Sequence, residues 1–514
     1  MLEGGDGSDR LTGKAGDDIL RGQKGQDTLV GGGGNDVTNG GWGQDRCSGD
    51  TETLCEMNPL NYQFQRFLIS QAVPQADSDQ PSNQRVGTVE KRAGIVRVFV
   101  TANEPNTPAP TMRVHWRVNG TTGSAKLTGP ATIPTNPDIG DLDTTYNYEF
   151  DESLLLPGAD MYVVIDPADA TLESNESDNR YPSQNWRDLD TQDVPKMKIT
   201  IVPITIQGGP LNGKSASISH SQAMNLLDKT FRVHPVGDYN VQVRENYVFQ
   251  NATGTQQDWI TLVYEMLDLQ QAENVNRQYH ALLPPEGLSP GFNAAGIGFI
   301  GAPAALSIQD EEVIAHETGH NLDLPHAPFC GAGGQIDANY PYPNGLVGTW
   351  GYDINTGDLY DPDVYKDLMT YCGPEWVSDY NFANVLDFRT STFGWETDLE
   401  FDSGPAPDGT KYVQFQGMVP TNWAQGALQK NLVGNVAEAK ITGVKIVDRL
   451  GLGPALGEHR IVGDDAAGNE EVSASFRSYA IDHADGAGVI VSSPIEDLDL
   501  LKGRTWRIMK ADEV

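Results

Sequence analysis

Hydrophobic and polar residues alternate along a stretch in the first half of the chain, and this pattern predicts β-strands. The clearest runs are Ile95–Val100, Met112–Val118 and Met161–Ile165, which are rich in β-branched and aromatic residues. Asn119-Gly120 follows the second run and is a hairpin turn signal. Short strands at this spacing, separated by Pro, Asn and Gly, predict an immunoglobulin-like β-sandwich over residues 60–187.

A helical period replaces this alternation further along the chain. Apolar residues at helical spacing predict an amphipathic helix over residues 256–269, whose stripe belongs to the core: Trp259, Leu262, Val263, Met266 and Leu267. Apolar strands are expected before and after it, at residues 199–202 and 296–301. From about residue 402 the pattern is strand-like again, which predicts a C-terminal β-sandwich over residues 399–514, with strands at 412–416, 439–447 and 488–491.

Residues 4–48 consist of five nine-residue repeats, each with Gly at the first and fourth positions and Asp at the sixth. The eighth position is Leu in the first three copies and then Thr38 and Cys47. Gly permits the tight turn at which carbonyl oxygens converge, and Asp adds a carboxylate, so the repeat provides oxygen-only sites for Ca²⁺. The eighth side chain points inward and stacks in a parallel β-roll. The predicted calcium ligands are Asp9, Asp18, Asp27, Asp36 and Asp45.

This first segment, residues 1–56, resembles the repeats-in-toxin nonapeptide family, which implies several structural Ca²⁺ ions. Leu2 falls where the eighth position of an earlier repeat would lie, so we expect the array to begin upstream. The end of the sandwich region, from Val164-Ile165-Asp166-Pro167 to Asn179, resembles the cell-adhesion-related domain of bacterial surface proteins. Its carboxylates either bind ions or lie in a solvated loop.

The charge of the chain restricts its partners. The 514 residues carry a formal net charge of −36, which would repel phosphates along most of the surface. This argues against nucleic acid or an anionic membrane as a partner, and suits a chain that binds cations or lives in salty water. No run reaches the ~18 apolar residues of a transmembrane helix, so we expect no membrane span. We expect a monomer with three to four domains, at roughly 150 residues each.

The four cysteines form two groups, Cys47 with Cys55 and Cys330 with Cys372. Their placement predicts two disulfides in an exported protein, and unpaired buried thiols are the alternative. The chain starts without the basic segment and apolar core of a signal peptide. We therefore expect either a fragment or bacterial-type export, to the medium or the cell surface, by a route without such a signal.

The strongest candidate for chemistry is a helical segment with two histidines. His316 and His320 are one helical turn apart and point the same way, so two imidazole nitrogens can meet one metal ion. Glu317 lies about 100° further round the helix, close enough to touch a metal-bound water without being a ligand. The chain can turn back after the helix to bring His326 in as a third ligand. Three neutral imidazoles and one open position are typical of a catalytic Zn²⁺, with Glu317 as general base. A surface helix with scattered histidines is the alternative.

Residues 316–326 resemble the metzincin signature HExxHxxGxxH, with Asp323 in place of the usual Gly. That Gly supplies a positive-φ turn, and Asp visits the left-handed region more readily than most residues, so the turn remains feasible at some cost. Downstream, Asp367-Leu368-Met369-Thr370-Tyr371 resembles the Met-turn, with Met369 beneath the metal. A Tyr two residues after the Met is the pattern of serralysins and astacins. This implies that Tyr371 binds the metal or steadies the oxyanion, and a plain core aromatic is the alternative.

The resemblance implies a metzincin-like α/β (α+β) catalytic domain over residues 194–398. A Cys330–Cys372 bridge would pin the third-ligand loop to the Met-turn, and the strand at residues 296–301 would pair with an extended peptide. Serralysins also carry nonapeptide repeats, although at the other end of the chain. Residues 353–363 are crowded with oxygen donors but depart from the EF-hand pattern, so they form either a Ca²⁺ site or an exposed acidic loop.

These observations predict a multidomain chain in which a zinc endopeptidase domain lies between two β-sandwich domains, with an N-terminal parallel β-roll. Its expected cofactors are one catalytic Zn²⁺ and several structural Ca²⁺ ions, and its expected substrate is a protein or glycoprotein. The alternative is a surface adhesin or matrix-binding protein whose peptidase-like domain is a scaffold without turnover. The presence of Glu317 favours the enzyme, because a scaffold needs no base beside the zinc. Hydrolysis of another amide, such as one in cell-wall peptide, is a third hypothesis.

Overall fold

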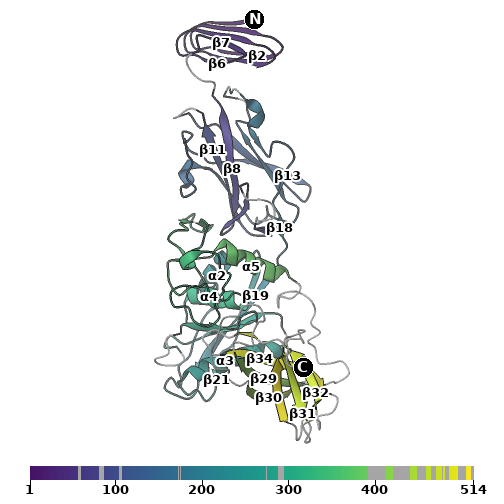
Figure 1. Ribbon diagram of the computed structural model, residues 1–514. Helices are drawn as coiled ribbons and strands as arrows, with labels where there is room; N and C mark the ends of the chain where they lie inside the picture. Colours follow the sequence, from purple (N-terminus) through teal and green to yellow (C-terminus); the bar gives the residue numbers. More distant parts are fainter. Residues whose placement is uncertain are drawn as a thin grey trace. The chain divides into compact units, whose positions relative to one another are not determined.

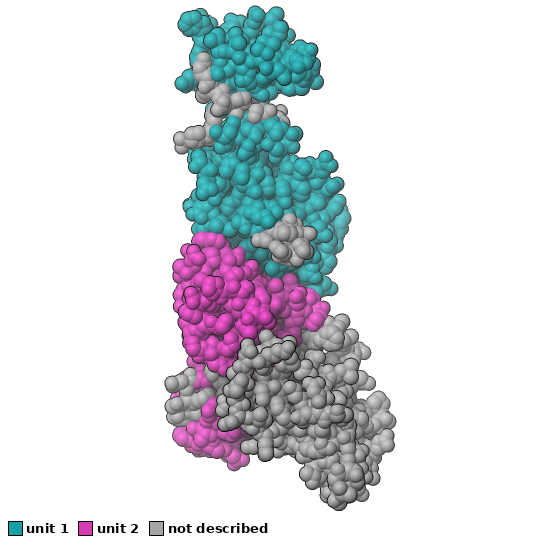
Figure 2. Space-filling view, viewed as in Figure 1, with its two compact units in different colours: residues 1–193, 352–359 teal, residues 194–351, 360–514 magenta. Residues whose placement is uncertain are grey.

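The computed structural model describes residues 1–391 apart from 56–59, 80–85, 104–106, 169, 172, 174, 274 and 288–293, together with seven strands beyond residue 391. The chain forms two compact units, residues 1–193 with 352–359 and residues 194–351 with 360–514 (Figure 2). Residues 352–359, which the sequence suggested would belong to the catalytic domain, thus group with the first unit. None of the described helices combines the length and the apolar character that crossing a membrane requires.

The nonapeptide repeats fold into short parallel strands, drawn in purple in Figure 1. They form two sheets with the orders β1-β3-β5-β7 and β2-β4-β6, so that each strand pairs with the strand two positions along the chain. Leu20 and Leu29, from the eighth repeat position, form a small core with Cys47. This arrangement agrees with a parallel β-roll. The strands are β1 (Leu2–Asp6), β2 (Arg10–Ala15), β3 (Ile19–Lys24), β4 (Thr28–Gly33), β5 (Val37–Trp42), β6 (Arg46–Ser48) and β7 (Thr51–Thr53).

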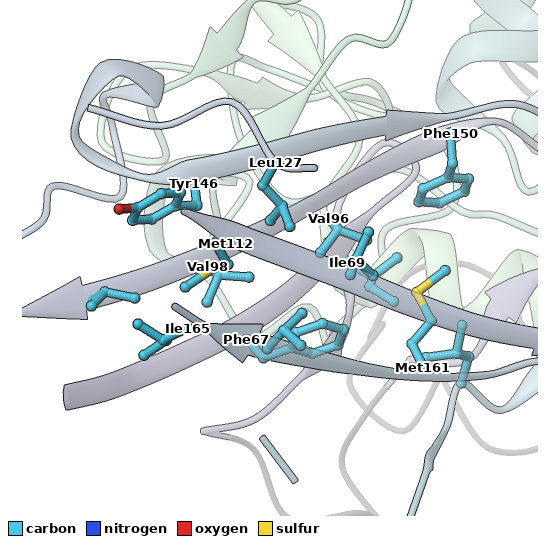
Figure 3. Close-up of a cluster of buried hydrophobic side chains, with 14 of the residues drawn as sticks. Phe67, Ile69, Val96, Val98, Met112, Leu127, Tyr146, Phe150, Met161 and Ile165 are labelled. Carbon is cyan, nitrogen blue, oxygen red and sulfur yellow. The ribbon is translucent and has the colours of Figure 1, made fainter. Parts of the chain in front are cut away.

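The first unit also contains two larger sheets with the orders β14-β11-β8-β9 and β13-β12-β15-β16, and β17 also pairs with β15. Both sheets contribute to one buried core, which includes Phe67, Val98 and Met161 (Figure 3). The three predicted strand runs are β11, β12 and β15, and Asn119-Gly120 forms the turn from β12 to β13. The strands and short helices are β8 (Tyr62–Ser70), β9 (Pro74–Asp77), β10 (Thr88–Val89), β11 (Gly94–Ala102), β12 (Met112–Val118), β13 (Thr121–Lys126), η2 (Leu142–Thr144), β14 (Tyr146–Phe150), β15 (Asp160–Ile165), η3 (Glu176–Asp178), β16 (Arg180–Tyr181), β17 (Arg187–Asp188) and β18 (Thr191–Gln192).

The second unit is organised around a sheet of order β20-β19-β22-β24-β23, and β21 also pairs with β19. All of its strand pairs are parallel except the last, because β23 runs antiparallel to β24 at the edge of the sheet. The elements are β19 (Met197–Ile206), α1 (His220–Leu226), α2 (Asp228–Val233), β20 (Tyr239–Val243), β21 (Tyr247–Phe249), α3 (Gln256–Glu273), β22 (Gln278–Leu282), β23 (Gly296–Gly298), β24 (Ala304–Ser307), α4 (Glu311–Asn321), η4 (Pro343–Gly345), β25 (Gly351–Tyr352), β26 (Leu359–Tyr360), β27 (Lys366–Asp367), β28 (Glu375–Trp376) and α5 (Asp379–Thr390).

Two helices cover this sheet. The predicted helix is α3, which extends to Glu273 and packs its apolar stripe into a core with Tyr279 and Ala281 of β22. Gln278 points to the other face, because side chains alternate along a strand, and its amide donates to Thr318 of α4. The sheet is therefore covered by α3 on one face and by α4 on the other. The predicted strand at residues 296–301 is shorter in the structure, where β23 ends at Gly298.

Beyond residue 391 two further antiparallel sheets have the orders β30-β29-β34-β33 and β32-β31-β35. Three of their strands coincide with the runs at 412–416, 439–447 and 488–491, although residue 439 and the connections between the strands lie outside the described residues. The strands are β29 (Lys411–Pro420), β30 (Lys440–Val447), β31 (His459–Asp464), β32 (Glu470–Phe476), β33 (Tyr479–Ala480), β34 (Gly486–Ile495) and β35 (Thr505–Lys510).

Candidate metal centre

Helix α4 carries the first two histidines and begins at a strong cap. The Asp310 carboxylate accepts hydrogen bonds from the backbone N–H groups of Glu312 and Val313, at 3.0 and 3.1 Å. Acidic residues in the first turn also favour the positive end of the helix dipole. The helix ends at Asn321, and Asp323 follows with a φ of 72°. Asp323 thus adopts the left-handed conformation expected for this turn, and the chain turns back at this point.

The turn brings His326 to the two helical histidines. One ring nitrogen from each of His316, His320 and His326 lies within 4.8 Å of the others, and all three residues are buried. The Nε2 atoms of His316 and His326 are 3.2 Å apart. Among the described residues this is the only cluster of three or more His, Cys, Asp or Glu side chains with the spacing to hold a metal ion. The loop at residues 353–363 contributes to no such cluster among the described residues.

The opposite ring nitrogen of each histidine contacts a backbone carbonyl. The Nδ1 atoms of His316, His320 and His326 lie 2.8, 2.7 and 2.7 Å from the carbonyl oxygens of Leu368, Leu324 and Gly333, respectively. A carbonyl only accepts, so each Nδ1 carries the proton and donates it. Each Nε2 is then left with a lone pair, and the three lone pairs are presented to one another. Metal-binding histidines are oriented by contacts of this kind.

Glu317 is 2% exposed and lies against the edge strand β23. A Cβ atom at Gly296 would be 2.4 Å from Glu317 Oε1, and one at Gly298 would be 3.1 Å from Oε2. The two glycines therefore leave the space that the carboxylate occupies. The edge strand and the carboxylate next to the first histidine form one closely packed unit.

The predicted Met-turn lies beneath the helix. Met369 is fully buried, and a Cβ atom at Gly319 would be only 2.7 Å from its Sδ atom. The buried carboxylate of Asp367 accepts hydrogen bonds from the backbone N–H groups of Met369 and Ser378 and from the side-chain amide of Asn381. Burial raises the pKa of Asp367, and these donors oppose that shift. Asp367 thus fixes the turn from both sides.

The loop that follows the third histidine is fastened to the Met-turn. The Ala327 N–H donates to the carbonyl of Met369 at 3.0 Å, and Cys330 is bonded to Cys372. The second predicted disulfide, Cys47–Cys55, is also present. The chain therefore contains no free cysteine.

Tyr371 lies at the exposed side of the histidine cluster. Its ring centroid is 4.8 Å from that of His326 and 5.9 Å from that of His316. The side chain is 38% exposed, so it is not the plain core aromatic that was the alternative. A residue in this position can reach both the histidine cluster and a molecule that approaches from solvent.

Two further residues support the helix and were not identified from the sequence. The buried His234 lies with Nε2 2.9 Å from the carbonyl of Ala315, and the Asn321 side-chain amide donates to the carbonyls of Phe299 and Ala304, both at 2.9 Å. Asn321 thereby fastens α4 to the connection between β23 and β24. Neither residue belongs to a local motif, and only their tertiary contacts indicate their roles.

The aspartates of the repeats form a second group of candidate ligands. The Asp9, Asp18 and Asp27 N–H groups donate, each at 2.8 Å, to Oδ1 of the Asp two repeats further on. The Oδ2 atoms of Asp9 and Asp27 are buried without a hydrogen-bond partner among the described residues. Burial also raises the pKa of Asp27. Buried carboxylate oxygens of this kind suit a bound cation.

Comparison with known protein families assigns two regions of the chain. Residues 3–38 match the RTX calcium-binding nonapeptide repeat family with four copies, and residues 248–373 match the Peptidase M66 family. The first match means that the β-roll repeats bind Ca²⁺, and RTX repeats are typical of secreted proteins. The second match means that the histidine cluster and the Met-turn lie within a peptidase domain, whose substrate is a protein. No curated protein matches the chain significantly.

Proposed function

We propose that this chain is a secreted zinc endopeptidase, with His316, His320 and His326 as the zinc ligands. The observation that carries the proposal is the convergence of three Nε2 atoms whose Nδ1 atoms face backbone carbonyls. Three histidines leave one coordination position open on a tetrahedral ion, as catalytic zinc sites require. The peptidase family match at residues 248–373 supplies independent support for the reaction class.

A zinc ion at this site would lower the pKa of a bound water and polarise the carbonyl of the scissile peptide bond. Glu317 would accept the proton of the attacking water and deliver it to the leaving amine. The glycines of β23 leave just enough space for this carboxylate, which limits the orientations open to it. The hydroxyl of Tyr371 would donate a hydrogen bond to the oxyanion of the tetrahedral intermediate.

The substrate would bind as an extended chain along β23. This strand pairs only with β24, so its other edge is the end of the described sheet. A peptide can add to such an edge by backbone hydrogen bonds. We further propose that the catalytic domain, over residues 194–398, is metzincin-like. The left-handed Asp323 and the Met-turn beneath α4 support this classification.

Zinc content and proteolysis, measured together on the same samples, test the proposal. The wild type should bind one zinc per chain, by elemental analysis, and should hydrolyse casein. Glu317→Ala should keep the zinc and lose the hydrolysis, because the ligands remain while the base is removed. Zinc with no hydrolysis in the wild type would favour the adhesin or a non-protein amide. Absence of zinc would refute the ligand assignment.

A further inference from the structure

An exposed aromatic ring with a cation over it lies in the loop after the third histidine. Phe329 is 36% exposed, and Lys366 Nζ is 5.2 Å from the centroid of its ring. A cation at this distance over an aromatic face is attracted to the π electrons. The pair combines an apolar surface with one positive charge.

The disulfide and the Met-turn place this pair beside the histidine cluster. Phe329 directly precedes Cys330, and Tyr371 directly precedes Cys372. The Cys330–Cys372 disulfide therefore links the segments that carry these two exposed aromatic residues. A Cβ atom at Gly345 would be 3.0 Å from Cβ of Phe329 and 2.6 Å from Cγ2 of Thr370. Phe329 therefore packs next to the Met-turn.

The ammonium group of Lys366 differs from several other cations of the second unit in its partners. Four other cations of the second unit form ion pairs: Lys196 with Asp238, Lys214 with Glu286, Arg232 with Asp228, and Arg244 with Glu273. Arg277 and Arg389 are buried and donate to backbone carbonyls. Lys366 forms no ion pair with any residue that the structure describes, and its ammonium group lies over the Phe329 ring, as that of Lys229 lies over Trp376. In a chain with a net charge of −36, a cation next to the site without an ion-pair partner can attract an anion.

We propose that Lys366 and Phe329 form a subsite that binds an anionic side chain of the peptide substrate. The inference rests on the proposed peptidase function and specifies the chemistry of one substrate residue. The Lys366 ammonium would pair with the carboxylate or phosphate of that residue, and the Phe329 ring would pack against its carbon atoms. The disulfide would hold the subsite at a fixed distance from the scissile bond.

The test uses matched peptides and the full chain loaded with zinc. Cleavage sites in casein are mapped by mass spectrometry, and one site is then synthesised with Glu or Gln at each flanking position in turn. A phosphoserine–serine pair at the preferred position separates carboxylate from phosphate recognition. For the wild type we expect kcat/KM to favour Glu over Gln at one position by roughly three- to fivefold, the effect of an exposed ion pair.

Substitutions of Lys366 then identify the origin of this preference. Lys366→Met keeps the apolar part of the side chain and should bring the Glu/Gln ratio close to one, and Lys366→Glu should invert it. Lys214→Met makes the same change in net charge and should keep the wild-type ratio. Circular dichroism and zinc content establish that each variant is folded and loaded.

Two results would overturn the subsite. One is equal cleavage of Glu and Gln peptides at every position by the wild type. The other is a Glu/Gln ratio that Lys366→Met and Lys366→Glu leave unchanged. In both cases the peptides are still cleaved, so the proposed peptidase function would stand. If the zinc-loaded wild type cleaved none of the peptides and no casein, the peptidase proposal itself would fall, and the subsite with it.

Discussion

The β-roll and the histidine cluster differ in what holds their candidate ligands in place. The β-roll core contains three fully buried side chains, Leu20, Leu29 and Cys47, whereas eighteen buried residues form the core around α3 in the second unit. So small an apolar core contributes little to folding, and we therefore expect Ca²⁺ to supply part of the folding energy of the β-roll. The histidines are instead held by carbonyls of a packed domain, which we expect to stay folded without the metal.

We expect the largest effect when each metal ion is removed in turn, because the β-roll should then lose its structure and the second unit should keep it. Chelation of Ca²⁺ with EGTA should abolish amide protection from hydrogen exchange across residues 4–48, because the buried Asp carboxylates then repel one another. The strands of the second unit should keep their protection. Removal of zinc with phenanthroline should end proteolysis but leave α4 and β22 protected. If the repeats kept their protection from hydrogen exchange in EGTA, or if α4 lost its protection in phenanthroline, the proposed difference between the two regions would be wrong.

A smaller effect should follow from filling the space beneath the helix. Gly319→Ala places a Cβ atom 2.7 Å from Sδ of the buried Met369, and overpacking of this kind costs about 1–3 kcal/mol. The sign is informative, because Gly→Ala inside a helix otherwise stabilises by about 1 kcal/mol. Thermal unfolding of the second unit measures the change. Gly333→Ala, where a Cβ atom would meet nothing within 4 Å, is the matched control and should shift Tm little. A higher Tm for Gly319→Ala would show that the Met-turn is loosely packed.

The smallest effect concerns how each region accommodates a buried carboxyl group. The buried carboxylates of the β-roll suit a bound cation, whereas the surroundings of Glu375 in the second unit favour its protonated form. Burial raises the pKa of Glu375 from 4.5 to about 7. The negative charges of Glu312, Asp367 and Asp310 add to this rise in pKa, and the positive charge of Lys229 opposes it. The folded state therefore holds this proton more tightly than the unfolded state. Stability should fall as pH rises from about 4.5 to about 7 and then level off.

Glu375→Gln tests this pH dependence, because the amide cannot ionise. The variant should lose this contribution to the pH dependence and should unfold a few degrees higher than the wild type above pH 7. Tm measured between pH 4 and pH 9, with calcium and zinc present throughout, gives the answer. Parallel curves for the two proteins would show that Glu375 has an ordinary pKa.

Local patterns were sufficient for several elements. The nine-residue period predicted parallel strands with Leu20 and Leu29 inward, and the apolar stripe at Trp259 predicted α3 to within four residues of its end. The family comparisons confirm the calcium-binding repeats and a peptidase domain. The zinc, Glu317 as base and Tyr371 stay predictions. The strand at residues 296–301 was predicted too long: β23 ends at Gly298, and the chain then turns through Gly301, which has a positive φ, toward β24.

The β-roll and the pair of helical histidines could be predicted from the sequence alone, because each depends on the spacing and chemistry of residues that are close together in the chain. The acidic character follows from composition. The remaining features depend on contacts between distant residues. No local pattern indicates the contacts of His234, Asn321 and the glycines of β23, yet these contacts set the position of α4 and its carboxylate. Lys366 directly precedes the predicted Met-turn in the sequence, but only the tertiary structure brings its ammonium group over the Phe329 ring of the loop after the third histidine.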